Sequence, residues 1–137
     1  MKLLDANIFM YASGADHRLK QPSTAILSMV REQRLDANTD IEAFQEIMHV
    51  YQSRRDVKTG IAITSAAMLL FPNALPVTIA TIRGGADILA RYPAIQSRDA
   101  IHAAVVFENG LEGIISADRG LDVIAGLVRF DPKELAA

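Results

Sequence analysis

Acidic side chains recur at the points where predicted strands end. Asp5 directly follows the apolar residues Leu3 and Leu4, and Asp118 follows the apolar segment 113–116. A short continuous apolar run is typical of a strand buried in a parallel sheet. Open α/β sheets place their ligands at the carboxyl ends of such strands. We therefore expect Asp5 and Asp118 to emerge side by side at one edge of a sheet, where their carboxylates would attract a cation.

Two predicted helices bring further carboxylates toward the same edge. Asp99 lies in the first turn of a helix over 97–107, and the helix that follows Thr39 carries Glu42 and Glu46. Carboxylates forced close together raise one another's pKa unless a cation intervenes. Oxygen-only ligation suits Mg²⁺ or Mn²⁺, and such an ion can activate water for phosphodiester cleavage. Taken singly, each acid also has a structural alternative as a helix cap, a helix-dipole partner or a solvated charge.

Helical periodicity separates Glu46 from Glu42. At about 100° per residue, the apolar positions of segment 41–53 fill roughly half of the helix circumference. Glu46 falls about 40° beyond Val50, at the edge of that apolar face, whereas Glu42 falls near the middle of the polar face. A metal ligand must reach inward while the ion stays accessible, so the periodicity favours Glu46.

The elements that would position these acids alternate along the chain. Helices are predicted over residues 21–33, 41–53, 57–70, 79–92 and 97–107, with a short helix over 118–124. Strands are predicted over residues 3–4, 35–38, 74–77, 113–116 and 127–130. Short strands that alternate with helices predict an α/β fold whose parallel sheet is covered on both faces. No repeat, low-complexity tract or linker interrupts the sequence, so we expect a single domain over residues 1–137.

Composition narrows the classes of function. The chain has 137 residues, enough for one domain with a real core, and half of them are hydrophobic, which argues against intrinsic disorder. A formal net charge of −2 excludes binding of nucleic acid through overall charge, so any such contact must use local basic patches or metal ions. The absence of cysteine excludes disulfides, thiolate catalysis and cysteine-ligated zinc.

No membrane segment is predicted. The first residues lack the basic and then apolar regions of a secretory signal. The longest apolar segment, residues 61–71, is interrupted by polar residues and is too short to span a bilayer. We therefore expect a cytoplasmic protein that makes no membrane contact.

Two histidines follow candidate acids at helical spacing. His49 lies three residues after Glu46, and His102 lies three residues after Asp99. Glu-x-x-His on the helices of a bundle is a di-iron signature, but the motif occurs once here and the predicted strands argue against a bundle. His102 lies among alanine and valine residues, which favours a buried, hydrogen-bonded histidine over a metal ligand. His49 is expected at the rim of the site.

Five segments together resemble a known family. They are Leu-Asp-Ala-Asn-Ile-Phe at residues 4–9, residues 39–46 with a helical glutamate, Ser-Arg-Asp-Ala-Ile-His-Ala-Ala at residues 97–104, Ile-Ile-Ser-Ala-Asp-Arg at residues 114–119, and the closing segment 126–132. In order and spacing these segments resemble the PIN-domain ribonucleases, and within them the VapC-like toxins of bacterial and archaeal toxin–antitoxin pairs. The resemblance extends over essentially the whole chain.

The resemblance implies a three-layer α/β/α sandwich around a central, mostly parallel sheet. It implies an endoribonuclease that depends on Mg²⁺ or Mn²⁺ and is inhibited by a cognate antitoxin protein. It assigns catalysis and metal ligation to four acids, which are Asp5, Glu46, Asp99 and Asp118. Ser116 matches the small hydroxyl residue near the fourth acid, and Asn7 matches the polar residue after the first acid. We expect Asn7 to hold Asp5 in place.

A receiver-like signalling domain is the alternative, because it also gathers aspartates around Mg²⁺ at strand ends. A receiver requires two adjacent acids after its first strand and a lysine at the end of a late strand. Here Asp5 has no acidic neighbour, and the last predicted strand ends in Arg129 and Phe130 without a lysine.

Two further groups of side chains have open interpretations. Arg54, Arg55 and Lys58 form the densest basic cluster, which is either a solvated helix end or a contact to RNA phosphates. An apolar set is either core or a surface for a dimer or an antitoxin helix, and comprises Met48, Ile61, Met68 and Leu69. With the family resemblance, the apolar helices predict a homodimer. Asp122, one turn after Asp118, is interpreted as a surface charge.

Overall fold

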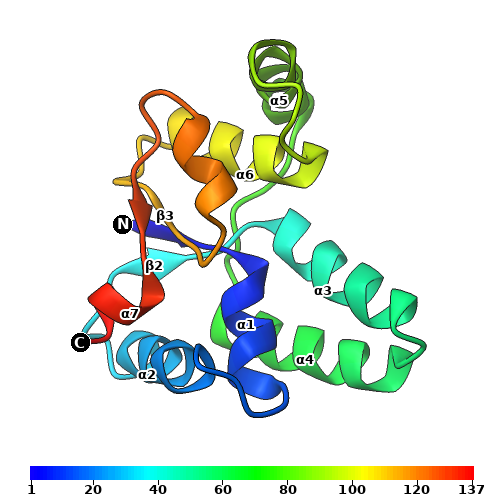
Figure 1. Cartoon of the computed structure of the whole chain (residues 1–137), viewed down its shortest axis with the longest axis vertical. Coiled ribbons are helices and arrows are strands. Elements are labelled where there is room, and N and C mark those ends of the chain that lie inside the picture. The colour runs from blue at the N-terminus through cyan, green and yellow to red at the C-terminus, as the bar shows by residue number, and fades with distance from the viewer.

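A four-stranded parallel sheet lies at the centre of the computed structural model, which describes residues 1–137 (Figure 1). Its strands are β1 (Lys2–Leu4), β2 (Ala37–Asn38), β3 (Ile114–Ile115) and β4 (Arg129–Phe130), in the order β2-β1-β3-β4 across the sheet. β1 thus pairs with strands from both halves of the chain, since Leu3 lies opposite Asn38 on one side and opposite Ile114 on the other. This pairing brings the residues that follow β1 next to those that follow β3.

Seven α-helices and one 3₁₀ helix surround the sheet. They are α1 (Ala6–Ser13), α2 (Lys20–Arg31), α3 (Ile41–Ser53), α4 (Val57–Leu70), α5 (Ile79–Arg91), α6 (Ser97–Glu108), η1 (Arg119–Val123) and α7 (Pro132–Leu135). Figure 1 shows α1 to α4 and α7 on one side of the sheet, and α5 and α6 on the other. None of the helices has both the length and the hydropathy needed to cross a bilayer.

Alternation along the short strands divides the core into two layers. Leu4 and Ile115 belong to one buried cluster, which they share with side chains of α1 to α4. Leu3 and Ile114 belong to a second cluster, which they share with side chains of α6 and η1. Successive side chains of a strand point to opposite faces, so both faces of the sheet are buried. The fold is therefore the predicted three-layer α/β/α sandwich around a parallel sheet.

The predicted strand over residues 74–77 is absent. Leu75 forms only an isolated parallel bridge with Asp40, and its N–H donates to the Thr39 carbonyl at 2.8 Å. Pro76 follows directly and has no N–H to extend a ladder. The other predicted strands are present but only two or three residues long, and the short helix predicted after β3 is 3₁₀.

Helix α3 buries most of the predicted face, but not its two apolar residues Ile41 and Met48. Asp40 caps this helix, and its buried residues are Ala43, Phe44, Glu46, Ile47 and Tyr51. The apolar residues Ile41 and Met48 are exposed instead, because an apolar side chain need not be buried. By the same periodicity Glu46 lies at the edge of this buried face, next to the half-buried Val50, as predicted. Glu42 is half-buried and does not lie in the middle of a polar face, which corrects the prediction.

Candidate active site and metal centre

Asp5 lies where β1 ends and α1 begins. It occupies the N-cap position of α1, but its carboxylate makes no capping hydrogen bond. The side chain is buried, and its Oδ2 accepts hydrogen bonds from Ser116 Oγ at 2.6 Å and from Asn7 Nδ2 at 3.4 Å. Burying a charge is costly unless the charge is paired. Capping does not explain Asp5, and only a positively charged neighbour would keep its buried carboxylate ionised.

Ser116 connects the ends of β1 and β3. Its Oγ donates to Asp5 and accepts from the Asp118 N–H at 3.0 Å and from Asn7 Nδ2 at 3.2 Å. Its backbone carbonyl accepts from Arg129 Nη1 at 3.0 Å. The hydroxyl proton and both lone pairs are thereby used. Ser116 therefore fixes the Asp5 carboxylate relative to the backbone of Asp118.

A buried histidine bridges α3 and α6. Nδ1 of His102 lies 2.7 Å from Asp40 Oδ2, and its Nε2 lies 3.1 Å from Glu46 Oε1 and 3.7 Å from Asp5 Oδ1. All four side chains are buried. His102 is thus the hydrogen-bonded histidine that the sequence indicated. The sequence carries no indication of the Asp40 contact, because a partner 62 positions away leaves no local pattern.

Burial and mutual repulsion shift the pKa values of this cluster. Burial raises the pKa of the Asp5 carboxyl, and burial together with the charges of Asp5 and Asp118 raises the pKa of Asp99 to about 7. Burial alone would lower the pKa of His102, but the neighbouring carboxylates, Asp40 above all, raise it well above its usual value. His102 is therefore an imidazolium at neutral pH. One imidazolium does not offset all of the carboxylates, so the cluster favours a further cation.

Three of the four predicted acids lie together in buried positions, and the fourth lies at the surface. Oxygens of Asp5 and Glu46 lie within 4.8 Å of one another and of His102 Nε2. Asp99, in the first turn of α6, is buried and interacts with the charges of both acids. Asp118 is exposed and caps η1 by accepting a backbone N–H at 2.8 Å, yet its charge still raises the pKa of Asp99.

The donor set suits a hard divalent cation. Such cations prefer carboxylate oxygens and retain some water or phosphate ligands. The buried acids would hold an ion from the protein side, and the exposed position of Asp118 leaves its other side open to solvent. After burial, the charges of Asp5 and Asp118 contribute to the raised pKa of Asp99, and binding a cation would relieve this repulsion.

The remaining candidates lie outside this cluster. The basic residues at the corner between α3 and α4 are exposed, and comprise Arg54, Arg55 and Lys58. His49 is exposed, and Asp122 forms a surface ion pair with Arg129 at 2.8 Å, as expected of a surface charge. Arg98 was missed by the sequence analysis, and its Nε lies 3.5 Å from Glu46 Oε2.

The fold and the acid cluster together define a family of proteins. The model of the PIN domain family matches residues 2–127, which is nearly the whole chain. The chain therefore belongs to the PIN-domain family. The predicted resemblance is confirmed, and a receiver is not supported.

The curated relatives define the branch of the family. The chain is 30% identical over 136 residues to Ribonuclease VapC7 of Mycobacterium tuberculosis, covering 96% of this chain and 92% of that relative. It is 31% identical over 130 residues to Ribonuclease VapC13 of the same organism, covering 95% and 99% of the two chains. The chain is thus a PIN-domain protein of the VapC group.

Solved structures show the same fold. One is the crystal structure of Mycobacterium tuberculosis VapC20, described as a sarcin-ricin loop cleaving toxin, with a TM-score of 0.76, 14% identity and coverage of 93% of this chain and 97% of that one. Another is FitAcB from Neisseria gonorrhoeae, with a TM-score of 0.73, 18% identity and coverage of 97% and 99%. At such identities the likeness establishes the fold alone.

Proposed function

We propose that the protein is a metal-dependent endoribonuclease and the toxin of a toxin–antitoxin pair. The observation that carries this proposal is the buried cluster of Asp5, Glu46 and Asp99, with Asp118 at its rim, in a PIN fold. Relatives covered over more than nine tenths of their length are named ribonucleases, which supports the same activity here. We further propose that residues 1–137 act as one domain and that the protein works in the cytoplasm, where it would meet RNA.

In this proposal four acids hold Mg²⁺ or Mn²⁺, namely Asp5, Glu46, Asp99 and Asp118. When bound, the ion supplies an activated water and stabilises the leaving oxygen of the phosphodiester. Ser116 and Asn7 keep the Asp5 carboxylate in one orientation through their hydrogen bonds. Asp99 must lose its proton before it can act as a ligand. Cleavage in this way would leave 5′-phosphate and 3′-hydroxyl ends.

Asp40 and His102 act as positioning residues for Glu46. The protonated ring of His102 donates one N–H to Asp40 and the other to Glu46. Asp40 is itself fixed, because its Oδ1 accepts the Ala43 N–H at 2.9 Å and caps α3. Groups that orient a metal ligand from behind in this way affect metal affinity and activity although they do not touch the ion.

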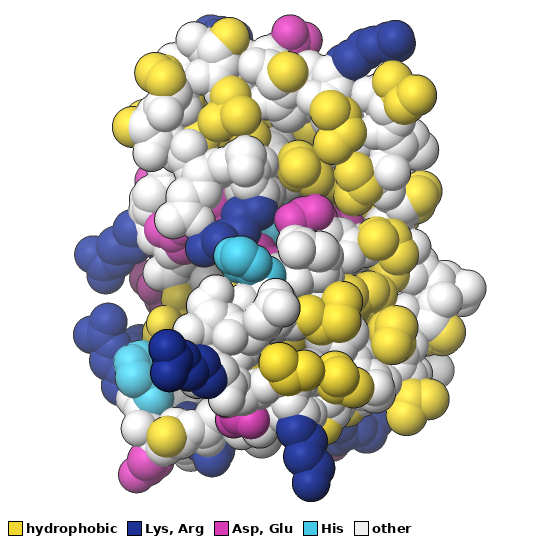
Figure 2. All heavy atoms as spheres, turned by 90° about the vertical axis from the view of Figure 1, so that its right-hand side faces the viewer, with side chains coloured by type: hydrophobic (Ala, Val, Ile, Leu, Met, Phe, Trp, Pro, Cys, Tyr) yellow, Lys and Arg dark blue, Asp and Glu magenta, His cyan; other side chains and the backbone are white.

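Exposed hydrophobic side chains on α3 and α4 support the proposal that a protein partner binds this surface. The apolar set whose location the sequence left open lies at the surface, with exposed fractions of 43% for Met48, 53% for Ile61, 46% for Met68 and 85% for Leu69. Figure 2 shows hydrophobic side chains gathered along one side of the face that it presents. Contiguous apolar surface of this kind marks interaction sites. We propose that this surface forms a homodimer.

A second partner is a cognate antitoxin. FitAB has been solved with a DNA fragment, and VapBC2 from Rickettsia felis has been solved with a promoter fragment. These structural neighbours support a protein partner that also contacts DNA. RNA would be the substrate, and Arg54, Arg55 and Lys58 would be among the residues that bind it.

Cleavage of RNA in the presence and absence of divalent metal tests the proposed function. The purified chain should cut a single-stranded RNA pool with Mg²⁺ or Mn²⁺ and should lose this activity in EDTA. The ion should also stabilise the fold, by about 2.7 kcal/mol at a hundredfold excess over its Kd, and so raise the melting temperature. Undiminished cleavage in EDTA, with metal shown to be absent, would exclude the metal mechanism.

Light scattering tests the homodimer separately. A result that finds only monomers at high concentration would exclude the homodimer.

A further inference from the structure

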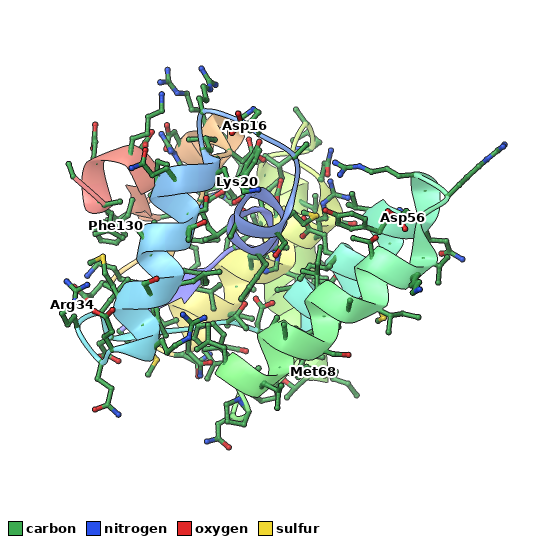
Figure 3. All side chains as sticks on the ribbon, turned by 90° about the horizontal axis from the view of Figure 1, so that it is seen from below. Asp16, Lys20, Arg34, Asp56, Met68 and Phe130 are labelled. Atoms are coloured by element: carbon green, nitrogen blue, oxygen red, sulfur yellow. The ribbon has the colours of Figure 1, made fainter.

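A cavity of about 510 Å³ opens beside the acid cluster and has no role in the proposed chemistry. It lies between the C-terminal half of α1, the loop that joins α1 to α2, and the corner between α3 and α4. Figure 3 labels Asp16 on that loop and Asp56 at that corner, and both residues line the cavity. The lining combines aromatic rings with charged groups of both signs.

The α1 side of the cavity carries a stacked pair of rings. The centroids of Tyr11 and His17 are 4.7 Å apart, with 21° between the ring planes. Two hydrogen bonds hold the loop in this conformation: Lys20 Nζ donates to the Gly14 carbonyl at 2.7 Å, and the Leu19 N–H donates to His17 Nδ1 at 3.1 Å. A neutral His17 ring that accepts at Nδ1 carries its proton on Nε2. That nitrogen is available as a donor.

The α3 side of the cavity carries a second aromatic ring with a guanidinium over it. The Arg54 guanidinium lies 5.1 Å from the centroid of the Tyr51 ring. Tyr51 is held against α4 at Gly60, where an added Cβ would come within 2.7 Å of the Tyr51 Cβ. The next residue, Arg55, has a φ of 57°, a left-handed conformation that is costly for a residue other than glycine. The corner thus places the Arg54 guanidinium over the Tyr51 ring, and both residues line the cavity.

Asn7 connects this cavity with the acid cluster. It lines the cavity, and its Nδ2 lies 3.4 Å from Asp5 Oδ2 and 3.2 Å from Ser116 Oγ. Its Oδ1 is buried and has no hydrogen-bond partner in the protein. A ligand in the cavity would therefore lie next to whatever is bound at Asp5.

We propose that this cavity binds one nucleobase of the RNA strand, next to the phosphodiester that is cut. The inference rests on the proposed function, because it assigns a subsite to the same substrate. Unpaired bases stack on aromatic rings and arginine planes. The stacked pair of Tyr11 and His17 and the Arg54 guanidinium supply such groups here. The Tyr51 ring, by contrast, is buried beneath Arg54. The carboxylates of Asp16 and Asp56 and the donors of Arg54 and His17 can hydrogen-bond to a base edge. This charged lining suits a base better than the apolar face of a protein helix.

The tyrosines of the chain give a direct binding test. The sequence has no tryptophan and three tyrosines, of which Tyr11 and Tyr51 line the cavity. The third, Tyr92, lies elsewhere, with its hydroxyl accepting the Ala125 N–H at 3.1 Å, and serves as an internal control. Ring signals should be followed by NMR in ¹³C-tyrosine-labelled protein, while nucleoside 5′-monophosphates or ribose 5-phosphate are added.

The proposal predicts that nucleotides shift the signals of Tyr11 and Tyr51 and leave Tyr92 unchanged. Ribose 5-phosphate should leave all three unchanged. Equal shifts with ribose 5-phosphate would show that the cavity binds phosphate. The absence of any shift with nucleotides would show that no base binds there and would favour a protein segment as the occupant. Either of these results overturns the proposal. This test does not depend on cleavage, so it stands even if the protein proves not to be a nuclease.

Cleavage of a randomised RNA pool tests the role of the cavity in substrate selection. Arg54→Gln and Tyr11→Leu should reduce the base preference at one position next to the cut by about tenfold. Arg91→Gln is the matched control, because Arg91 lies 5.8 Å from the Tyr92 ring centroid in a comparable pair outside the cavity. The control should keep the wild-type preference. An unchanged preference in both cavity variants would overturn the proposal.

Discussion

Nε2 of His102 lies 3.1 Å from Oε1 of Glu46, so a ring on α6 holds a carboxylate that α3 provides. The other nitrogen of the ring lies 2.7 Å from Asp40, the residue that caps α3. The two contacts tie the start and the second turn of α3 to one point on α6. The ring is also the only cation buried among the acids. Through His102, the packing of α3 against α6 therefore sets the position of Glu46, a proposed metal ligand.

Asp40→Asn should lower cleavage about 10- to 100-fold, the usual cost of removing a group that orients a metal ligand. Asn caps a helix as well as Asp does, so the change removes the charge beside His102 and keeps the cap. Asp131→Asn is the matched control, because Asp131 caps α7 by accepting a backbone N–H at 2.8 Å and lies outside the acid cluster. Calorimetric Mn²⁺ affinity should fall in Asp40→Asn and not in the control. Equal affinities in the two variants would show that Asp40 only caps.

Asp5→Asn should abolish cleavage and leave the metal-free protein at least as stable as the wild type. Burial raises the pKa of Asp5, which means that the fold disfavours its charged form. A neutral amide removes this penalty, and its oxygen can still accept the hydrogen bond from Ser116. Thermal unfolding in EDTA measures the effect. A clear loss of stability would identify Asp5 as a structural ion-pair partner of His102 instead.

Glu46→Gln should lose most of the activity, whereas Glu42→Gln should keep it. Glu46 is buried and held by His102, whereas Glu42 is half-buried and makes no hydrogen bond to His102. RNA cleavage by the two purified variants at saturating Mg²⁺ decides between the two glutamates. An inactive Glu42→Gln beside an active Glu46→Gln would show that the assigned ligand is wrong.

Metal affinity should depend on pH through Asp99. Its pKa is raised from 3.8 to about 7 in the metal-free fold. Between these two values the folded chain holds a proton that the unfolded chain has lost, so the stability of the metal-free protein falls as pH rises. The ion displaces that proton, and its affinity should therefore rise about tenfold per pH unit up to this pKa.

Calorimetric titration of Mn²⁺ at several pH values below and above that pKa measures this dependence. In Asp99→Asn the rise should flatten, since the variant has no proton to release at this position. A wild-type affinity that is independent of pH over the range would contradict the assigned protonation of Asp99.

The sequence predicted the parts of the site that local patterns encode. Apolar runs followed by Asp5 and Asp118 predicted the strand ends correctly, because strands buried on both faces are continuously apolar. The predicted buried face of α3 wrongly included Ile41 and Met48, which are apolar but exposed, because periodicity alone cannot distinguish core positions from apolar positions at the surface. The link from Asp40 to His102 could not be predicted, since it depends on how α3 and α6 pack.

The position of β1 in the middle of the sheet also determines when the site can form during synthesis. Asp5 leaves the ribosome before the other acids of the cluster, its hydrogen-bond partner Ser116 follows 111 residues later, and β4 follows after that. Chains are made from the N-terminus, and contacts this far apart close last. A growing chain that still lacks β3 cannot assemble the acid cluster. A nuclease with this order of strands would thus stay inactive until β3 has been synthesised, which protects the ribosome and the messenger RNA during most of translation.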